Sequence, residues 1–145
     1  MDNLRIGICD DEPQDLAHIL ELVKLYDSDS QLQVTTFLHA KNLLDEARKT
    51  GFDITLLDIE MEPPTGFDAA KALIAMPEPP IVIFATKSNA YALKGYGVAI
   101  RYLQKPVTRA DFFEAMDAAV EDATAHRLTF QMDNTLVSIR LRDVQ

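Results

Sequence analysis

Five polar residues that could bind a metal ion or a phosphoryl group stand where apolar segments of the chain end. Asp10 and Asp11 follow the first such segment directly, and Asp58 ends another. Thr86 ends a third, and Lys105 follows a fourth. Together they offer three carboxylates, one hydroxyl and one ammonium group. These are the functional groups of a site for a divalent cation and a phosphate.

The apolar segments have the length and composition of buried parallel strands, because they are short, rich in Ile, Val, Leu and Phe, and separated by helix-length intervals. One further alternating segment completes the set. The predicted strands cover residues 4–9, 32–37, 52–58, 81–86 and about 99–104. In an open α/β sheet, ligands bind just outside the carboxyl ends of the strands. We therefore expect the five polar residues to meet at one edge of a sheet.

Helical periodicity fills the intervals between these strands. In the first interval Leu16, Ile19, Leu20 and Val23 repeat at helical spacing, with Pro13 near the first turn. Further helices are predicted around residues 43–47, which Gly51 closes, 67–74, 88–93 and 108–120, which a Thr108–Asp111 capping box opens. The order (βα)5 predicts an α/β fold with a doubly wound parallel sheet and helices on both faces. Residues 128–141 alternate around an Asp-Asn pair and predict a C-terminal β-hairpin tail.

Composition indicates a globular protein with an acidic surface. The 145 residues include 23 acidic and 14 basic side chains, for a net charge of −9, so the chain itself should not bind nucleic acid strongly. No apolar run approaches the roughly 18 residues that span a bilayer. The lone Cys9 is expected to be a small buried hydrophobe in a reducing, cytoplasmic setting. His18, His39 and His126 lack metal-ligand spacing and are expected to be solvated.

The acidic residues favour a divalent cation. Three carboxylates within a few ångströms repel one another unless a cation lies among them, and oxygen-only ligands select Mg²⁺ or Mn²⁺. For Asp10 and Asp11 an alternative stays open, in which they belong to an acidic first turn that complements a helix dipole. Asp58 does not help packing at the end of a buried strand. Beside a cation it could attack a phosphoryl group and form an acyl phosphate.

Lys105 and Thr86 would complete such a site. Lys105 would bring a positive charge to the phosphoryl oxygens, and Pro106 would fix the loop that holds it. The isomer of the peptide bond before Pro106 stays open. Thr86 offers a hydroxyl donor. Either residue alone is more often ordinary surface, so the combination at several strand ends is what favours phosphoryl chemistry.

With these residues, the chain resembles the receiver domain of two-component response regulators over about residues 3–124. The resemblance is carried by the residues Asp10, Asp11, Asp58, Gly66, Thr86, Tyr102, Lys105 and Pro106 in the order and approximate spacing of that family. It implies a flavodoxin-like receiver in which a sensor histidine kinase donates a phosphoryl group to Asp58.

The resemblance also implies roles for the surrounding residues. Mg²⁺ (or Mn²⁺) would be held by Asp10, Asp11, Asp58 and the backbone carbonyl of Glu60. Lys105 and Thr86 would stabilise the phosphoryl group. Thr86 and Tyr102 would form the switch pair that moves inward on phosphorylation. On this reading the protein is a phosphoacceptor and no enzyme beyond its own phosphorylation and dephosphorylation.

Two stretches, 8–12 and 102–106, resemble the branch of receivers that carries a LytTR-type DNA-binding domain. Residues 139–144 resemble the end of the first hairpin of that domain. We therefore expect a receiver at 1–126 and, at 127–145, the start of a β-rich DNA-binding domain that the chain, as a truncated product, does not complete. DNA would be bound only through that output domain, in a homodimer formed on activation, without any membrane association.

Three alternatives remain open. A phosphohydrolase would use Asp58 as nucleophile and Glu60 as acid, although such enzymes usually have a second Asp at that place. A flavodoxin-like cofactor binder would need a phosphate loop where the chain has Asp10, Asp11 and Glu12, whose charges repel FMN phosphate. A receiver-like interaction module that is never phosphorylated would keep the fold without using the site.

Overall fold

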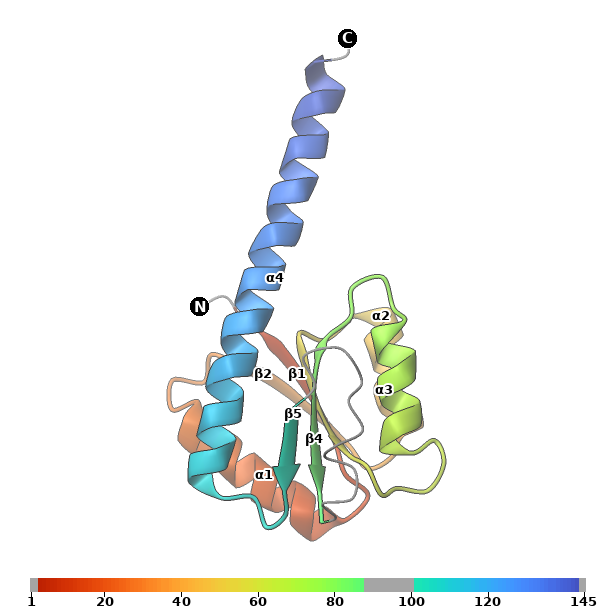
Figure 1. The fold of residues 1–145 in the computed structure, drawn as a ribbon, viewed down its shortest axis with the longest axis vertical. Helices are drawn as coiled ribbons and strands as arrows, with labels where there is room; N and C mark the ends of the chain where they lie inside the picture. Colours follow the sequence, from red (N-terminus) through yellow and green to blue (C-terminus); the bar gives the residue numbers. More distant parts are fainter. Residues whose placement is uncertain (1–2, 88–100, 144–145) are drawn as a thin grey trace.

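The computed structural model describes residues 3–87 and 101–143, and its centre is one parallel sheet (Figure 1). The strands are β1 (Arg5–Cys9), β2 (Gln33–Phe37), β3 (Ile54–Asp58), β4 (Ile81–Thr86) and β5 (Arg101–Gln104). They lie in the order β2-β1-β3-β4-β5, and every neighbouring pair is parallel. This confirms the predicted doubly wound α/β sheet.

Helices cover both faces of the sheet. Helices α1 (Pro13–Tyr26) and α4 (Arg109–Asp143) lie on one face, and α2 (Ala40–Lys49) and α3 (Gly66–Ile74) lie on the other (Figure 1). The predicted helix around residues 88–93 lies outside the described residues. The strand period of two sends alternate side chains to opposite faces. In β3, Leu56 packs with α1 and α4, whereas Leu57 packs with α2 and α3.

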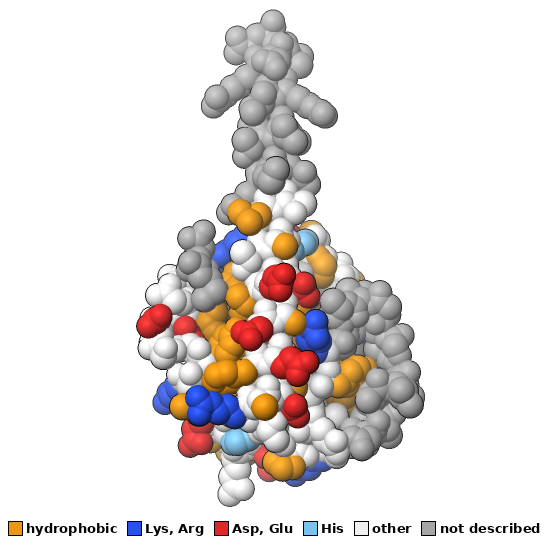
Figure 2. Space-filling model, turned by 60° about the vertical axis from the view of Figure 1, so that its left-hand side comes forward, with side chains coloured by type: hydrophobic (Ala, Val, Ile, Leu, Met, Phe, Trp, Pro, Cys, Tyr) orange, Lys and Arg blue, Asp and Glu red, His pale blue; other side chains and the backbone are white. Residues whose placement is uncertain are grey.

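Both faces of the central strands are therefore buried, which explains why their sequences are continuously apolar. All five residues of β3 are buried, whereas the edge strand β2 holds none. Helix α4 is instead amphipathic, with one buried side. Its residues Phe112, Met116 and Ala119 are buried against the sheet. Its outer side carries exposed acidic residues, visible as a red stripe in Figure 2: Asp111, Glu114, Asp117 and Glu121.

Local signals at the helix ends agree with the sequence. Gly51 follows α2 with a φ of 77°, a conformation that favours glycine. The Thr108 hydroxyl accepts the N–H of Asp111 at 3.1 Å where α4 begins. A reciprocal capping box at α3, between Thr65 and Asp68, was not predicted from the sequence.

The predicted hairpin at residues 128–141 is wrong, because α4 continues as one helix to Asp143 (Figure 1). Two strands without a sheet to join are marginal in water. A helix that is already nucleated against the sheet instead adds one internal hydrogen bond for each residue that it gains. Arg127, near the middle of α4, forms an ion pair with Asp53 at 3.5 Å, next to the start of β3. Within the described ranges, no helix is both long enough and apolar enough to cross a lipid bilayer.

Gly66, the first residue of α3, lies against the backbone that follows β3. A Cβ atom at this position would stand 2.3 Å from the carbonyl oxygen of Asp58 and 2.7 Å from the Cα of Ile59. The Gly66 N–H donates to the Ile59 carbonyl at 3.1 Å. Glycine is therefore required here for close approach, and α3 is seated directly on the loop that follows Asp58.

We predict that Gly66→Ala lowers the free energy of unfolding by about 1–3 kcal/mol, because the added methyl group meets backbone atoms that cannot rotate away. Urea unfolding followed by circular dichroism measures the change. A control is Ala72→Gly, which removes a methyl group from the same helix at a position without this contact, and should lose about 1 kcal/mol through helix propensity together with the packing of a partly buried methyl group. An unfolding free energy of Gly66→Ala equal to that of the parent would contradict the prediction.

Candidate functional site

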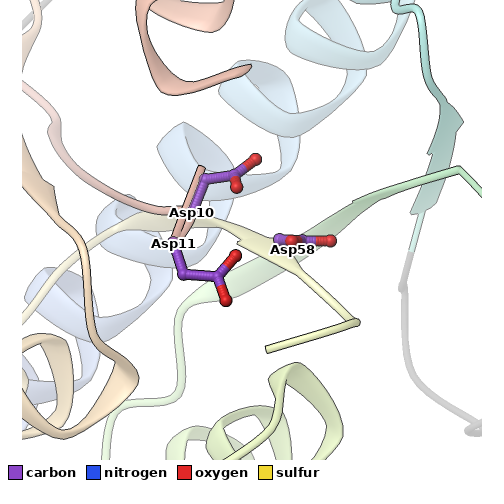
Figure 3. Close-up of side chains that lie close together, drawn as sticks. All are labelled: Asp10, Asp11 and Asp58. Atoms are coloured by element: carbon purple, nitrogen blue, oxygen red, sulfur yellow. The ribbon is translucent and has the colours of Figure 1, made fainter. Parts of the chain in front are cut away.

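Three carboxylates gather at the carboxyl edge of the sheet, as predicted. Asp10 and Asp11 follow β1, and Asp58 ends β3, which pairs with β1. One oxygen of each lies within 4.8 Å of the others (Figure 3). Asp10 and Asp58 are only 3% and 6% exposed, and Asp11 is half-buried. The topology thus brings together side chains that are 48 positions apart in the sequence.

Backbone hydrogen bonds fix the two buried carboxylates. The Asp10 N–H donates to the Phe37 carbonyl at 3.1 Å, which extends the β1–β2 ladder by one residue. The Asp10 carboxylate accepts the N–H of Glu12 at 3.0 Å. The Asp58 carboxylate accepts the N–H of Glu60 at 3.3 Å, while the Glu60 side chain is exposed. Main-chain N–H groups thus hold one oxygen of each of these two carboxylates.

Lys105 is the cation of this site. Its Nζ donates to Asp10 at 2.7 Å and to Asp15 at 2.9 Å, and it lies 3.6 Å from an oxygen of Asp58. The Lys105 N–H donates to the Thr86 carbonyl at 2.7 Å, so β4 and β5 position it, and the peptide bond before Pro106 is cis. Burial works to lower the pKa of Lys105, but the bonds to Asp10 and Asp15 outweigh it and raise the pKa. Lys105 therefore stays charged.

Negative charge exceeds positive charge around Asp58. Burial, together with the charges of Asp10 and Asp11, raises the pKa of its carboxyl to about 6 against the opposing effect of Lys105. A buried carboxylate with this environment is under-neutralised at neutral pH. The three oxygen donors of Asp10, Asp11 and Asp58 therefore suit a hard divalent cation, which would supply the missing positive charge.

Cys9, the last residue of β1, is buried next to the carboxylates. Its side chain is buried and its thiol lies 3.7 Å from the sulfur of Met61. Burial, together with the charges of Asp10 and Asp11, raises the pKa of the thiol to about 12. The thiol is therefore protonated at neutral pH, and the prediction of a small buried hydrophobe is confirmed.

Thr86 and Tyr102 share one face of the sheet beside the carboxylates. Tyr102 pairs with Phe84 in the β4–β5 ladder, and Thr86 stands two residues after Phe84. The rings of Phe84 and Tyr102 pack with centroids 5.4 Å apart. Thr86 is buried and Tyr102 is half-buried. The geometry places the predicted switch pair on neighbouring strands and on the same side.

Sequence reasoning missed two residues of α1, Asp15 and His18. Asp15 binds Lys105, and the Nε2 of the exposed His18 lies 2.9 Å from the carbonyl oxygen of Val107, two residues after Lys105. A signal for Asp15 existed, since it is an acidic residue in the first turn of the helix that follows Asp10 and Asp11. No comparable signal marks His18, because its partner is a backbone atom that is 89 positions away.

Comparison with known proteins identifies the fold. A family model of the response regulator receiver domain matches residues 6–117. Among solved structures, a two component transcriptional regulator AraC from Clostridium phytofermentans has a TM-score of 0.73 at 23% identity, covering 86% of this chain and 98% of that chain. The response regulator TrrA from Thermotoga maritima, in complex with Mg²⁺-BeF, has a TM-score of 0.65 at 23% identity, covering 82% and 99%. These likenesses confirm the flavodoxin-like receiver fold.

Curated relatives agree with the predicted LytTR-type branch. The sensory transduction protein LytT of Bacillus subtilis is 33% identical over 107 residues, which are 71% of this chain and 42% of LytT. The positive alginate biosynthesis regulatory protein of Pseudomonas aeruginosa is 34% identical over 119 residues, 80% of this chain and 47% of that protein. The chain thus spans less than half the length of these two relatives. Because the family model covers most of its residues, the chain belongs to the response regulator receiver domain family.

Proposed function

We propose that this receiver accepts a phosphoryl group on Asp58 from a sensor histidine kinase. The observation that carries the proposal is the setting of the Asp58 carboxylate, which is buried, under-neutralised and flanked by Asp10, Asp11 and Lys105. A carboxylate in this setting is a poor structural element and a good acceptor, because a cation and Lys105 can both stabilise the charge of an incoming phosphoryl group.

Mg²⁺ (or Mn²⁺) would be held by Asp10, Asp11, Asp58 and the backbone carbonyl of Glu60. When bound, it would neutralise charge on the carboxylates and on the phosphoryl oxygens. The excess of carboxylates over ammonium groups at the site supports this assignment. So does the Mg²⁺-BeF complex of the Thermotoga maritima relative in fold.

The remaining chemistry falls to side chains of this chain. A carboxylate oxygen of Asp58 attacks phosphorus, and the bond between phosphorus and the histidine nitrogen of the kinase breaks, which releases the imidazole. Lys105 Nζ donates to a phosphoryl oxygen, and the Thr86 hydroxyl donates to another. Thr86 and Tyr102, on the same side of β4 and β5, couple this event to the surface formed by β5 and its neighbouring helices.

For the whole protein we propose control of transcription in the cytoplasm. The relatives with sequence similarity are longer than this chain, and their names describe sensory transduction and regulation. An output domain that begins within 127–145 would bind DNA as a dimer after phosphorylation. The receiver itself, with its acidic outer face on α4, is unsuited to DNA.

The phosphohydrolase alternative gains no support from the geometry. Glu60, which would act as the acid, has an exposed side chain, and the contact of this residue with Asp58 runs through its backbone N–H. An unphosphorylated interaction module would require a reason for keeping a raised pKa at Asp58. We therefore propose a phosphoacceptor whose only catalysis is its own phosphorylation and dephosphorylation.

The first prediction concerns the acceptor. Incubation with acetyl phosphate and Mg²⁺ should add one phosphoryl group to the parent, because Asp58 is the nucleophile, and intact mass measures the adduct. Asp58→Asn and an excess of chelator should each abolish it. Asp45→Asn, an exposed carboxylate on α2, is the matched control and should be phosphorylated like the parent. An adduct that persists in Asp58→Asn would refute the assignment.

The second prediction concerns pH. The pKa of Asp58 is about 6 in the folded protein, against 3.8 for an unperturbed Asp. The folded state therefore keeps a proton that the unfolded chain has lost, and stability falls as pH rises from about 4 to about 6. Without metal at pH 7.5, Asp58→Asn should be more stable than the parent by about 2–3 kcal/mol, since it cannot ionise.

Urea unfolding in the presence of chelator measures this difference, which should vanish below pH 4. Adding Mg²⁺ at pH 7.5 should stabilise the parent more than Asp58→Asn, because the cation neutralises the carboxylates. Asp45→Asn again serves as the control and should follow the parent at each pH. A lower stability of Asp58→Asn than of the parent at pH 7.5 would contradict the charge excess.

The third prediction concerns the switch. A shift from 1:99 to 99:1 between two states needs about 5.5 kcal/mol, and charge-assisted bonds from Thr86 and Lys105 at about 1.5–3 kcal/mol each would supply much of it. Thr86→Ala should still be phosphorylated yet lose the change in association that phosphorylation causes. Sedimentation with and without acetyl phosphate measures the response, and Thr36→Ala on the edge strand β2 is the control. A response of Thr86→Ala equal to that of the parent would exclude the coupling.

A further inference from the structure

Two side chains of α1 hold the loop that carries Lys105. Asp15 accepts a hydrogen bond from Lys105 Nζ at 2.9 Å, and His18 Nε2 lies 2.9 Å from the carbonyl oxygen of Val107. Residues three apart in a helix lie on the same face, so both contacts come from one side of α1. The loop is thus held at the lysine itself and again two residues later.

The contact with Asp15 draws Lys105 away from the acceptor. Nζ is 2.7 Å from Asp10 and 2.9 Å from Asp15, which are hydrogen-bond distances, but it is 3.6 Å from Asp58. Asp15 lies outside the group of three carboxylates that could share a cation. Asp15 therefore would not share a cation with Asp58. It competes with Asp58 for the ammonium group of Lys105.

The backbone of the loop is anchored by the buried Val107, but the Lys105 side chain borders open space. A cavity of about 200 Å³ lies beside the contact, lined by Asp15, His18, Ile19, Lys105, Pro106 and Val107. A close-packed loop would be fixed by its neighbours whatever its charges did. Here the polar contacts with Asp10 and with Asp15 of α1 determine where Lys105 Nζ lies.

We infer that Asp15 is a positioning residue that holds Lys105 in the unphosphorylated arrangement and opposes its transfer to the phosphoryl group. The inference rests on the proposed phosphorylation of Asp58. Lys105 Nζ must break its hydrogen bond to Asp15 before it can donate to the phosphoryl group. Asp15 therefore lowers both the extent of phosphorylation and the lifetime of the acyl phosphate. Its own negative charge, close to the incoming phosphoryl oxygens, acts in the same direction.

Two other roles for Asp15 predict different results. If Asp15 only complements the dipole of α1, its removal should change stability slightly and phosphorylation not at all. If it orients Lys105 for the reaction, its removal should slow phosphorylation. The proposed role alone predicts that removal promotes the phosphorylated form.

The test measures binding of beryllium fluoride in the presence of Mg²⁺ by calorimetry, and the half-life of the phosphorylated protein by intact mass after acetyl phosphate is removed. Asp15→Asn should bind beryllium fluoride more tightly, on the order of threefold to thirtyfold, which is the range for a partly exposed charged hydrogen bond. The half-life of phosphorylated Asp15→Asn should also be longer than that of the phosphorylated parent. Asp15→Ala should behave alike, and Asp15→Glu should return toward the parent.

Glu12→Gln is the matched control, because Glu12 is exposed, precedes α1 directly and its side chain does not cap the helix. It measures the general effect of removing one negative charge near the site, and affinity for Mg²⁺ alone measures the same effect on the cation. The gain in beryllium fluoride affinity of Asp15→Asn should exceed that of Glu12→Gln. An equal gain, no gain or a loss would each overturn the inference.

A second measurement separates this inference from the proposed function. In a crystal structure of Asp15→Asn without phosphodonor, Lys105 Nζ should lie within hydrogen-bond distance of Asp58. An unchanged position of Nζ would overturn the inference even if the parent is phosphorylated. Failure of the parent to accept a phosphoryl group would overturn the proposed function, whatever the position of Nζ.

Discussion

The mutual repulsion of three carboxylates at the end of two neighbouring strands is the constraint on which the site depends. Asp10 and Asp58 are buried and charged, and among the residues that the structure describes Lys105 is the cation that offsets part of their charge. The fold tolerates this because backbone N–H groups and the β4–β5 ladder hold the participants. A cation and a phosphoryl group, as proposed for this site, would relieve the repulsion that the fold leaves uncompensated.

The close contact of Gly66 with the Asp58 backbone also constrains the site. It seats α3 on the loop that leaves β3, so the N-terminus of the helix lies directly against the backbone of Asp58 and Ile59. On the other side of the sheet, α1 reaches the Lys105 loop through Asp15 and His18. Elements from both faces therefore meet at the same few residues.

Sequence reasoning found the residues at strand ends because their signal is local, a polar group at the end of a short apolar run. Asp58 and Lys105 could be paired in advance because parallel topology forces strand ends to one edge. Asp15 and His18 were missed because their importance depends on how α1 packs against a loop about 90 positions away. The hairpin prediction failed because residues 128, 132 and 136 also share a helical face, so the sequence fits both the strand period of two and the helical period of 3.6. Because helix α4 already runs into this segment, the segment is helical.

Helix α4 begins three residues after Pro106 and continues well past the sheet, so it has the geometry of a lever arm. Beyond the ion pair between Arg127 and Asp53, 16 residues of helix, Leu128 to Asp143, project from the body (Figure 1). At 1.5 Å per residue this arm is about 24 Å long, so a tilt of about 10° at Arg127 would move its tip by about 4 Å. A displacement too small to disturb the core near Lys105 would thereby arrive at the far end as a movement the size of a side chain.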